Sequence, residues 1–236
     1  MHNLHKWDVS YAEARQLQTE LAGRVRFEPL RKQPRLIAGL DCAFSADGTR
    51  VLAAAVLLKV LSQGQDASQK TLSFAFEQVE TATAAVKLTF PYIPGLLSFR
   101  EAPACLAAVE KLKNQPDVFL IDGQGIAHMR RLGLATHLGL FLDKPTIGCA
   151  KSRLVGTHEP PAQEKGAHSP LRDGDEIIGA VVRTRRGVKP LFVSVGHKCQ
   201  LEDAVQITLA CATKYRLPEP TRLAHHAVSN FKKRLQ

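Results

Sequence analysis

Two aspartates stand in or beside apolar runs, where a charged side chain is unfavourable. Asp41 lies inside the otherwise uncharged stretch 37–44, IAGLDCAF, and Asp122 directly follows the apolar stretch 118–121, VFLI. Removing a carboxylate from water is unfavourable unless the charge is paired or binds a metal. In open α/β sheets ligands bind at the carboxyl ends of strands, and Asp122 would lie at such an end. Either aspartate alone could instead cap a strand end or form a surface salt bridge.

A shared site for the two acids predicts a divalent cation. Carboxylates that face each other across neighbouring strands repel unless a cation lies between them. Mg²⁺ suits such a site because it takes oxygen ligands from carboxylates, water and phosphates. Gly123 and Gly125 follow the second apolar stretch as in a dinucleotide-binding loop, but His128 stands where that motif needs its third glycine. We therefore favour a metal site over a nucleotide-binding loop.

The pattern of apolar residues predicts the elements that position these acids. We expect a helix over residues 10–23 with Ser10 as its N-cap, followed by an antiparallel meander of three strands over 36–44, 51–60 and 71–79. Helices then alternate with short apolar strands, which is typical of parallel strands joined by crossover helices. These helices are expected over 102–113 and 130–142, and the strands over 117–121 and 145–150. A hairpin over 177–183 and 191–195 and a last long helix over 201–214 complete the order.

This order predicts an α/β fold: a ribonuclease H-like mixed sheet in which an antiparallel meander is followed by βαβ units, with flanking helices. In that fold the first strand neighbours the first parallel strand, which would place Asp41 beside Asp122. A length of 236 residues with 44% hydrophobic content suits a single domain over residues 1–236. We expect a flexible loop at about 159–175, which is rich in Pro, Gly, His and charge, and a frayed tail at about 231–236.

The charge balance indicates a polyanionic partner. Lys and Arg number 32 against 22 Asp and Glu, and the net charge of +10 favours nucleic acid or an acidic membrane surface. The best candidate for phosphate contact is the basic cluster in the hairpin connection, Arg183, Arg185, Arg186 and Lys189. Five scattered cysteines without C-x-x-C spacing predict reduced thiols rather than a zinc site or disulfides. No apolar run is long enough to cross a bilayer, so we expect a cytoplasmic protein without a membrane partner.

One segment carries a specific resemblance. Residues 91–101, PYIPGLLSFRE, resemble the signature of the endonuclease V family, the deoxyinosine 3′-endonucleases. Four other segments agree with that family in order and spacing, namely residues 37–44, 121–128, 148–156 and 217–225. The resemblance extends over roughly residues 10–230.

The resemblance implies a set of catalytic residues. It makes Asp41, Glu101 and Asp122 the metal-binding acids, with Mg²⁺ as the cofactor and Mn²⁺ able to substitute. Lys151 would steady negative charge on the phosphate. His225 takes the position of a fourth group near the metal, where some family members carry Asp, and His226 beside it is the alternative.

The resemblance also implies how a damaged base is read. Tyr92, Ile93 and Pro94 are similar to the family's strand-separating wedge, and an aromatic side chain that enters the stack offsets the unstacking of a base. Prolines on both sides of the wedge stiffen it by fixing φ. The alternative is a rigid surface loop with a buried tyrosine. The base pocket would comprise Gly95, Leu97, Gly123, His128, Gly133, Gly148 and Leu154.

The implied activity is hydrolysis of DNA that contains deoxyinosine, in DNA repair. The cut would fall at the second phosphodiester bond 3′ to the lesion, leaving 3′-hydroxyl and 5′-phosphate ends, as an endodeoxyribonuclease that produces 5′-phosphomonoesters. Inosine-containing RNA is the alternative substrate, and a non-catalytic nucleic-acid-binding module of the same fold is the alternative of another class. A glycosylase is disfavoured because strand cleavage would then need a separate lyase step. We expect a monomer.

Overall fold

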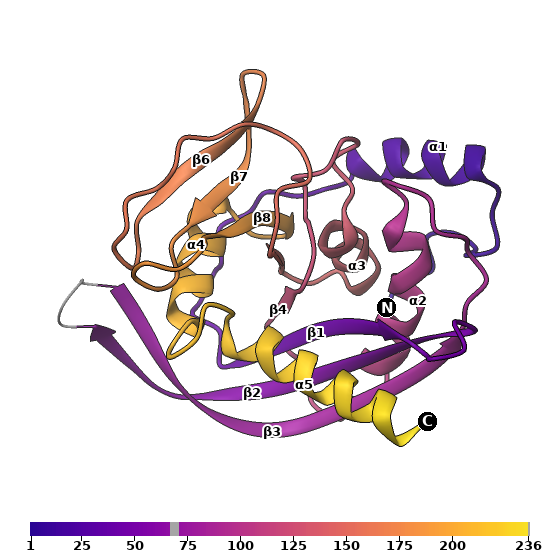
Figure 1. Cartoon of the computed structure of the whole chain (residues 1–236), viewed down its shortest axis with the longest axis horizontal. Coiled ribbons are helices and arrows are strands. Elements are labelled where there is room, and N and C mark those ends of the chain that lie inside the picture. The colour runs from indigo at the N-terminus through magenta and orange to yellow at the C-terminus, as the bar shows by residue number, and fades with distance from the viewer. Residues whose placement is uncertain (67–70, 236) are drawn as a thin grey trace.

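An eight-stranded mixed sheet forms the centre of the molecule (Figure 1). The computed structural model describes residues 1–66 and 71–235. The strands are β1 Leu36–Phe44, β2 Arg50–Asp66, β3 Thr71–Lys87, β4 Val118–Ile121, β5 Thr146–Ala150, β6 His168–Asp173, β7 Glu176–Val182 and β8 Leu191–His197. The helices are α1 Tyr11–Ala22, α2 Leu97–Val109, α3 Leu134–Leu142, α4 Leu201–Cys211 and α5 Glu219–Arg234.

The sheet combines an antiparallel meander with parallel strands, which confirms the expected fold class. Its strand order is β3-β2-β1-β4-β5-β8-β7-β6. β1, β2 and β3 pair antiparallel, whereas β1, β4 and β5 pair parallel. The register places Leu40 beside Ile121, and the amide of Asp122 donates to the Leu40 carbonyl oxygen at 3.1 Å. Asp41 and Asp122 therefore follow a paired position on neighbouring strands, as the sequence predicts.

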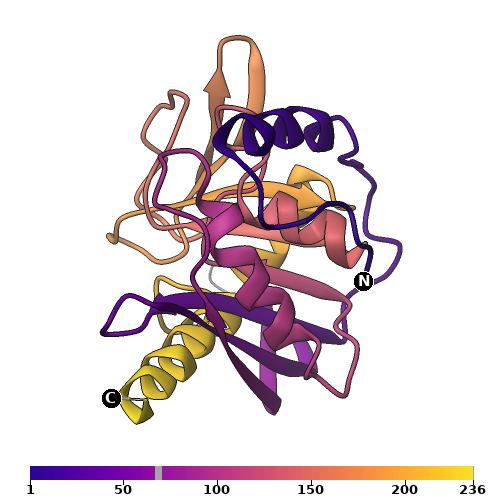
Figure 2. The same cartoon turned by 90° about the vertical axis from the view of Figure 1, so that its right-hand side faces the viewer.

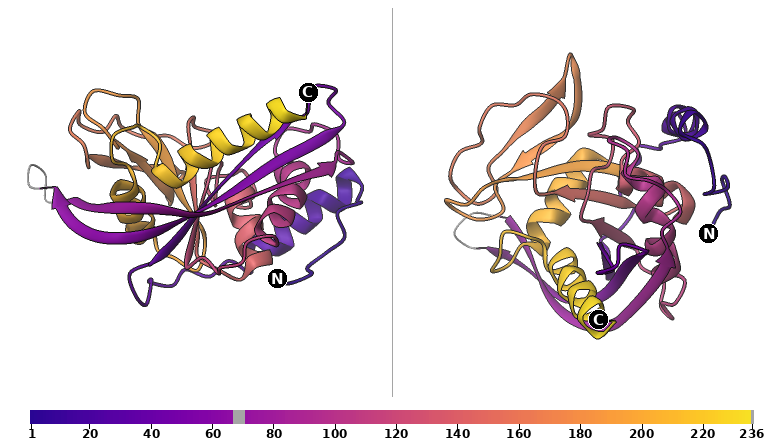
Figure 3. Two further views of the ribbon diagram at one scale, coloured as in Figure 1. Left: turned by 90° about the horizontal axis from the view of Figure 1, so that it is seen from below. Right: turned by 45° about the vertical axis from the view of Figure 1, so that its right-hand side comes forward.

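Alternation along the strands sends side chains to two helical layers. Ala38, Leu40, Phe119 and Ile121 pack in the core beneath α2 and α3, whereas Ile37, Val118 and Leu120 pack in the core beneath α4. α5 covers the same face as α4, and α2 and α3 lie on the other side of the long strands (Figure 3). Because side chains alternate with a period of two, Asp41 points to the α5 face and Cys42 to the α2 face.

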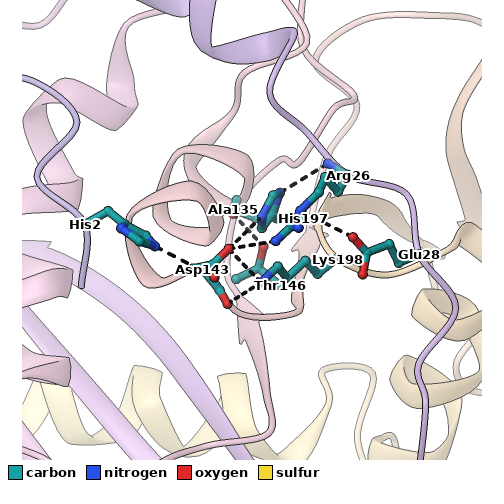
Figure 4. Close-up of polar contacts among 8 residues, drawn as sticks. All are labelled: His2, Arg26, Glu28, Ala135, Asp143, Thr146, His197 and Lys198. Atoms are coloured by element: carbon teal, nitrogen blue, oxygen red, sulfur yellow. Dashed lines mark hydrogen bonds and ion pairs between the residues drawn. The ribbon is translucent and has the colours of Figure 1, made fainter.

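A network around Asp143 fastens the chain that links α1 to β1. Asp143 ends α3 with φ at +50°, and its Oδ1 accepts from Arg26 Nη2 at 3.0 Å and from Lys198 Nζ at 2.6 Å (Figure 4). The ion pair with Lys198, followed by the charge of Arg26, lowers the pKa of Asp143 to about 2. The network ties the irregular segment that contains Arg26 to the turns after α3 and β8.

The N-terminal helix forms as its sequence predicts. The Ser10 hydroxyl accepts from the Glu13 amide, and the Glu13 carboxylate accepts from the Ser10 amide at 2.7 Å, so a capping box starts α1. α2 begins five residues earlier than expected, at Leu97 instead of Ala102, and its N-cap residue Leu96 offers no side-chain hydrogen bond. The sequence therefore carried no start signal for α2.

The structure corrects the expectations for the last third of the chain. The predicted loop at 159–175 contains a regular strand, β6, which pairs with β7 in a hairpin that projects from the sheet (Figure 2). The helix predicted as the last one ends at Cys211, and α5 follows it. α5 extends to Arg234, so residues 231–234 are helical and not a frayed tail, because Val228 and Phe231 pack against Leu52 and Ala54 of β2. Residue 236 and residues 67–70, in the polar connection between β2 and β3, lie outside the described residues.

Among the described residues, no helix combines the length and the apolar character that crossing a membrane requires.

Candidate active site

Three potential metal ligands from distant segments converge at the carboxyl end of the central strands. Asp41 lies in β1, Asp122 directly follows β4, and His225 lies in the second turn of α5. One ligand atom from each lies within 4.8 Å of the others. The convergence follows from the fold, because β1 and β4 are neighbours and α5 packs across β1 on the face to which Asp41 points.

Hydrogen bonds orient the Asp41 carboxylate. Its Oδ1 accepts from the Cys42 amide at 2.8 Å, and its Oδ2 accepts from His225 Nδ1 at 2.7 Å. Burial, followed by the negative charge of Asp122, nevertheless raises the pKa of Asp41 above its ordinary value. His225, rather than the neighbouring His226, makes the contact with Asp41, so the structure distinguishes the two histidines that the sequence left open.

Glu101 adds a third carboxyl group to this region. It lies in the second turn of α2, and burial followed by the charges of Asp41 and Asp122 raises its pKa to about 7. The close group of three ligands contains His225 in place of Glu101. The predicted set of acids is thus gathered in one region, with Glu101 further from the centre than the two aspartates.

Lys151 supplies the positive charge nearest to Asp122. Its Nζ forms an ion pair with Asp122 Oδ2, and two-fifths of its side chain remains exposed. Arg216 Nη2 holds the strand end that carries Lys151 by donating to the Lys151 and Pro190 carbonyl oxygens, each at 2.8 Å. The sequence analysis did not single out Arg216, because its position in a loop carries no motif or periodicity.

The donor set fits a divalent cation. Two half-buried carboxylates and an imidazole lie within reach of one atom, and the Glu101 carboxyl is partly protonated near pH 7 because burial and the two aspartates raise its pKa. Hard cations such as Mg²⁺ and Mn²⁺ prefer carboxylate oxygens. A bound cation would offset the repulsion that raises the pKa values of Asp41 and Glu101.

The tyrosine loop that precedes α2 is exposed at its tip. Tyr92 is 70% exposed, which excludes the alternative of a buried tyrosine. Ile93 anchors the loop because it packs against Phe90, Leu96 and Phe99. Pro94, like Pro91, is exposed beside the tyrosine. The loop thus exposes a large aromatic ring to solvent, while the neighbouring Ile93 packs against the hydrophobic core.

The glycines of the predicted base pocket differ in their surroundings. A Cβ on Gly148 would lie 2.5 Å from the Gly125 amide nitrogen, and one on Gly133 would lie 2.6 Å from the Gly125 carbonyl oxygen. These two positions therefore require glycine for backbone packing around Gly125, whereas a Cβ on Gly123 would only reach ordinary contact with Leu134. Their part in reading a base stays a prediction.

Of the remaining residues of the predicted pocket, His128 is buried, whereas Leu97 and Leu154 lie at the surface. His128 is 4% exposed, and its Nδ1 accepts from the Arg130 amide at 3.2 Å. Burial, followed by the charge of Arg130, lowers the pKa of His128 to about 4, so its imidazole is neutral at pH 7. Leu97 and Leu154 are both exposed, and their contact with a base stays a prediction.

The basic cluster in the hairpin connection differs from its prediction. Arg183 is buried and its guanidinium donates to the carbonyl oxygens of Pro161, Ala162 and Val188. It therefore holds the loop that precedes β6 and cannot contact phosphate, whereas Arg185, Arg186 and Lys189 are exposed. The described cysteines are all free thiols, as expected, with Cys42 and Cys105 in contact at 3.2 Å between their sulfur atoms.

Fold and site together define an α/β protein with a carboxylate-rich candidate metal centre beside an exposed aromatic loop. Comparison with known proteins identifies its relatives. Residues 19–226 match the family model of Endonuclease V. An endonuclease V from Nostoc sp. is 50% identical over 228 residues, covering 96% of this chain and 97% of the relative.

Solved structures agree with this match. The endonuclease V of Streptomyces avermitilis superposes with a TM-score of 0.86 at 40% identity, covering 97% of this chain and 96% of that one. The Ciona intestinalis endonuclease V, solved with a 24mer DNA containing an inosine followed by a ribo-adenosine, superposes with a TM-score of 0.77 at 28% identity, covering 95% and 98% of the two chains. The chain belongs to the endonuclease V family, and its relatives indicate a nuclease.

Proposed function

We propose that this chain is a Mg²⁺-dependent endonuclease that recognises deoxyinosine in DNA and serves DNA repair. It hydrolyses the second phosphodiester bond 3′ to the lesion and leaves 3′-hydroxyl and 5′-phosphate ends. The observation that carries this proposal is the convergence of Asp41, Asp122 and His225 beside Lys151. The Ciona relative bound to inosine-containing DNA supports the substrate.

The site residues divide the chemistry between them. When bound, the cation supplies Lewis-acid polarisation of the phosphate. Asp41 and Asp122 would hold the cation through their anionic oxygens, and His225 fixes the orientation of the Asp41 carboxylate through its hydrogen bond. The Lys151 ammonium offsets the negative charge that grows on the phosphate in the transition state. Water attacks phosphorus and gives up a proton, the bond from phosphorus to the 3′ oxygen breaks, and that oxygen takes up a proton.

We assign recognition of the base to the exposed tyrosine loop and to main-chain groups at the glycines of the predicted pocket. Tyr92 occupies the place that the damaged base leaves in the stack. Hypoxanthine presents an acceptor at O6 and a donor at N1, which is the reverse of adenine. Main-chain groups that lie close to the base can read this difference, and glycines suit this role because no side chain keeps the base away from them.

The test is cleavage of end-labelled strands with one inosine, as single- and double-stranded DNA and RNA of one sequence, in Mg²⁺, Mn²⁺ or EDTA. We expect a single cut in DNA with either cation and none in EDTA. Asp41→Ala and Asp122→Ala should lose cutting by at least about 10³-fold while still binding the inosine strand, because they remove cation ligands. Asp175→Ala, an exposed acid in the β6–β7 turn, is the control and should cut normally.

Full cleavage by either variant in Mg²⁺ would end the metal-site proposal. Faster cleavage of the RNA strand than of the DNA strand would replace the DNA substrate by RNA. Binding of the inosine strand without cleavage by the wild-type protein would support the non-catalytic module instead.

A further inference from the structure

A single backbone carbonyl joins three distant segments around the tyrosine loop. The Gly95 carbonyl oxygen accepts from Gln18 Nε2 at 2.9 Å and from Arg130 Nη2 at 2.8 Å. Gln18 belongs to α1, Arg130 to the turn that precedes α3, and Gly95 to the connection between Tyr92 and α2. The structure places the Arg130 guanidinium against this loop.

Gln18 is buried and its amide is fully used. Its side chain is 1% exposed, its Nε2 also donates to the Leu132 carbonyl oxygen at 3.1 Å, and its Oε1 accepts from Arg130 Nε at 2.5 Å. The other buried residues of α1, Ala14 and Leu21, pack in apolar clusters. An apolar residue at position 18 would bury its surface without needing partners, whereas a buried amide must keep every hydrogen bond. The Gln18 amide is therefore suited to fixing the position of the Gly95 carbonyl relative to α1.

Gly95 itself is adapted to this contact. Its φ is +78°, a conformation that glycine adopts without strain. A Cβ there would lie 2.9 Å from both Arg130 Nη2 and Met129 Sδ. Any larger residue at 95 would displace the guanidinium that, with Gln18, holds the loop.

We propose that Gln18 is a positioning residue for lesion recognition: together with Arg130 it holds the Gly95 carbonyl and so fixes the tyrosine loop relative to the turn that carries His128. This inference rests on the proposed function. By this proposal α1 takes part in selecting the substrate. Gln18 acts through its hydrogen bonds with the Gly95 carbonyl and with Arg130, and it does not itself contact the nucleic acid.

The clamp acts on binding more than on bond cleavage. Gly95 lies three residues from Tyr92, so release of its carbonyl lets the loop sample more conformations, and the ordering of these residues must then be repeated each time a lesion binds. Asp41, Asp122 and Lys151 lie on other elements and keep their own contacts. Loss of the clamp should therefore raise KM for an inosine substrate and leave kcat nearly unchanged.

The test compares Gln18→Leu and Gln18→Glu with Gln16→Leu. Leucine removes every hydrogen bond at nearly constant volume, and glutamate can still accept from Arg130 but cannot donate to Gly95. Gln16 lies on the exposed face of the same helix and pairs with Glu20 at 2.7 Å, so its replacement is the matched control. Arg130→Gln removes the guanidinium contact from the other side without altering α1.

Two readouts decide the outcome. Amide hydrogen exchange over residues 91–97 should quicken in both Gln18 variants and in Arg130→Gln, while β1 and β4 stay protected. KM for inosine-containing DNA should rise on the order of tenfold with kcat within about twofold, and Gln16→Leu should match the wild type. Unchanged loop exchange in all three variants, or a fall in kcat at constant KM, would overturn the inference.

The exchange experiment also separates this inference from the proposed function. A wild-type protein that does not cut or bind inosine strands would refute the proposed function and with it the part assigned to lesion recognition. If the loop amides were then still released by Gln18→Leu, the clamp itself would be confirmed as a property of the fold.

Discussion

Replacement of Gly39 by alanine should disturb the candidate metal centre by pushing α5 away from β1. Gly39 lies in β1 two residues before Asp41, on the face that α5 covers. A Cβ at this position would lie 2.7 Å from the Thr221 amide nitrogen and closer still to the Pro220 carbonyl oxygen. Both obstacles are backbone atoms in the first turn of α5, so no side-chain rotation can relieve the overlap.

The size of the effect follows from these contacts. Ordinary contact begins near 3.4 Å, so the Thr221 amide nitrogen alone requires a movement of about 0.7 Å, and the Pro220 carbonyl oxygen, which is nearer, requires the start of α5 to move further still. Metal sites tolerate about 0.2 Å in ligand distance. His225, one turn further along α5, would therefore leave its position beside Asp41. Overpacking against backbone should also lower the free energy of unfolding by about 2–3 kcal/mol.

Two measurements on Gly39→Ala check this reasoning, with Gly64→Ala in β2 as the control because a Cβ there has nothing within 4 Å. Urea unfolding gives the loss of stability, and calorimetric titration with Mn²⁺ gives the metal affinity, which we expect to fall at least about tenfold. The control should keep its metal affinity. A Gly39→Ala protein with wild-type stability and Mn²⁺ affinity would show that α5 is not held against β1 at this point.

Two further predictions concern Tyr92 and His128, two residues assigned to recognition of the base. Tyr92→Ala should weaken binding of inosine-containing DNA by about tenfold or more, since stacking of a base on an aromatic ring contributes about 1–3 kcal/mol; the Mg²⁺ dependence of cleavage should not change, and an unaltered Kd in a filter-binding assay would remove the wedge. His128 has a folded pKa of about 4, below its ordinary 6.5, so its contribution to stability is present above pH 6.5 and is lost as the pH falls towards 4. Between pH 7 and pH 5 the wild type should therefore lose about 2 kcal/mol more unfolding free energy than His128→Gln in parallel urea titrations; equal losses would show that His128 is not buried in its neutral form.

The pairing of the two aspartates could be predicted from local patterns. Asp41 interrupts an uncharged strand and Asp122 ends a buried one, and a meander followed by strand–helix alternation makes their strands neighbours. These signals are local because apolar periodicity and strand ends depend on nearby residues only. The position of Glu101 came instead from resemblance, since nothing in the spacing of α2 indicates that its second turn approaches β1.

The end of the chain shows where interpretation of the sequence stopped short. The segment that forms α5 carries helix signals, Pro220 near its start and Lys232, Lys233 and Arg234 in its last turn, yet its polar composition resembles a tail. Its stability comes from packing Val228 and Phe231 against β2. Arg183 is likewise interpreted from the sequence as a surface charge. Its three carbonyl partners, Pro161 and Ala162 in the loop before β6 and Val188 in the β7–β8 connection, come together only in the folded chain.

By itself, the sequence determined that the first strand neighbours the first parallel strand and hence that Asp41 lies beside Asp122, because a meander followed by strand–helix alternation is a pattern that the segments themselves carry. Only the tertiary structure decided that His225 rather than His226 contacts Asp41 and that Gln18 reaches Gly95. Those contacts depend on how closely α5 approaches Gly39 and how α1 lies over the tyrosine loop. Such approaches are set by the packing of whole elements, and no local pattern encodes them.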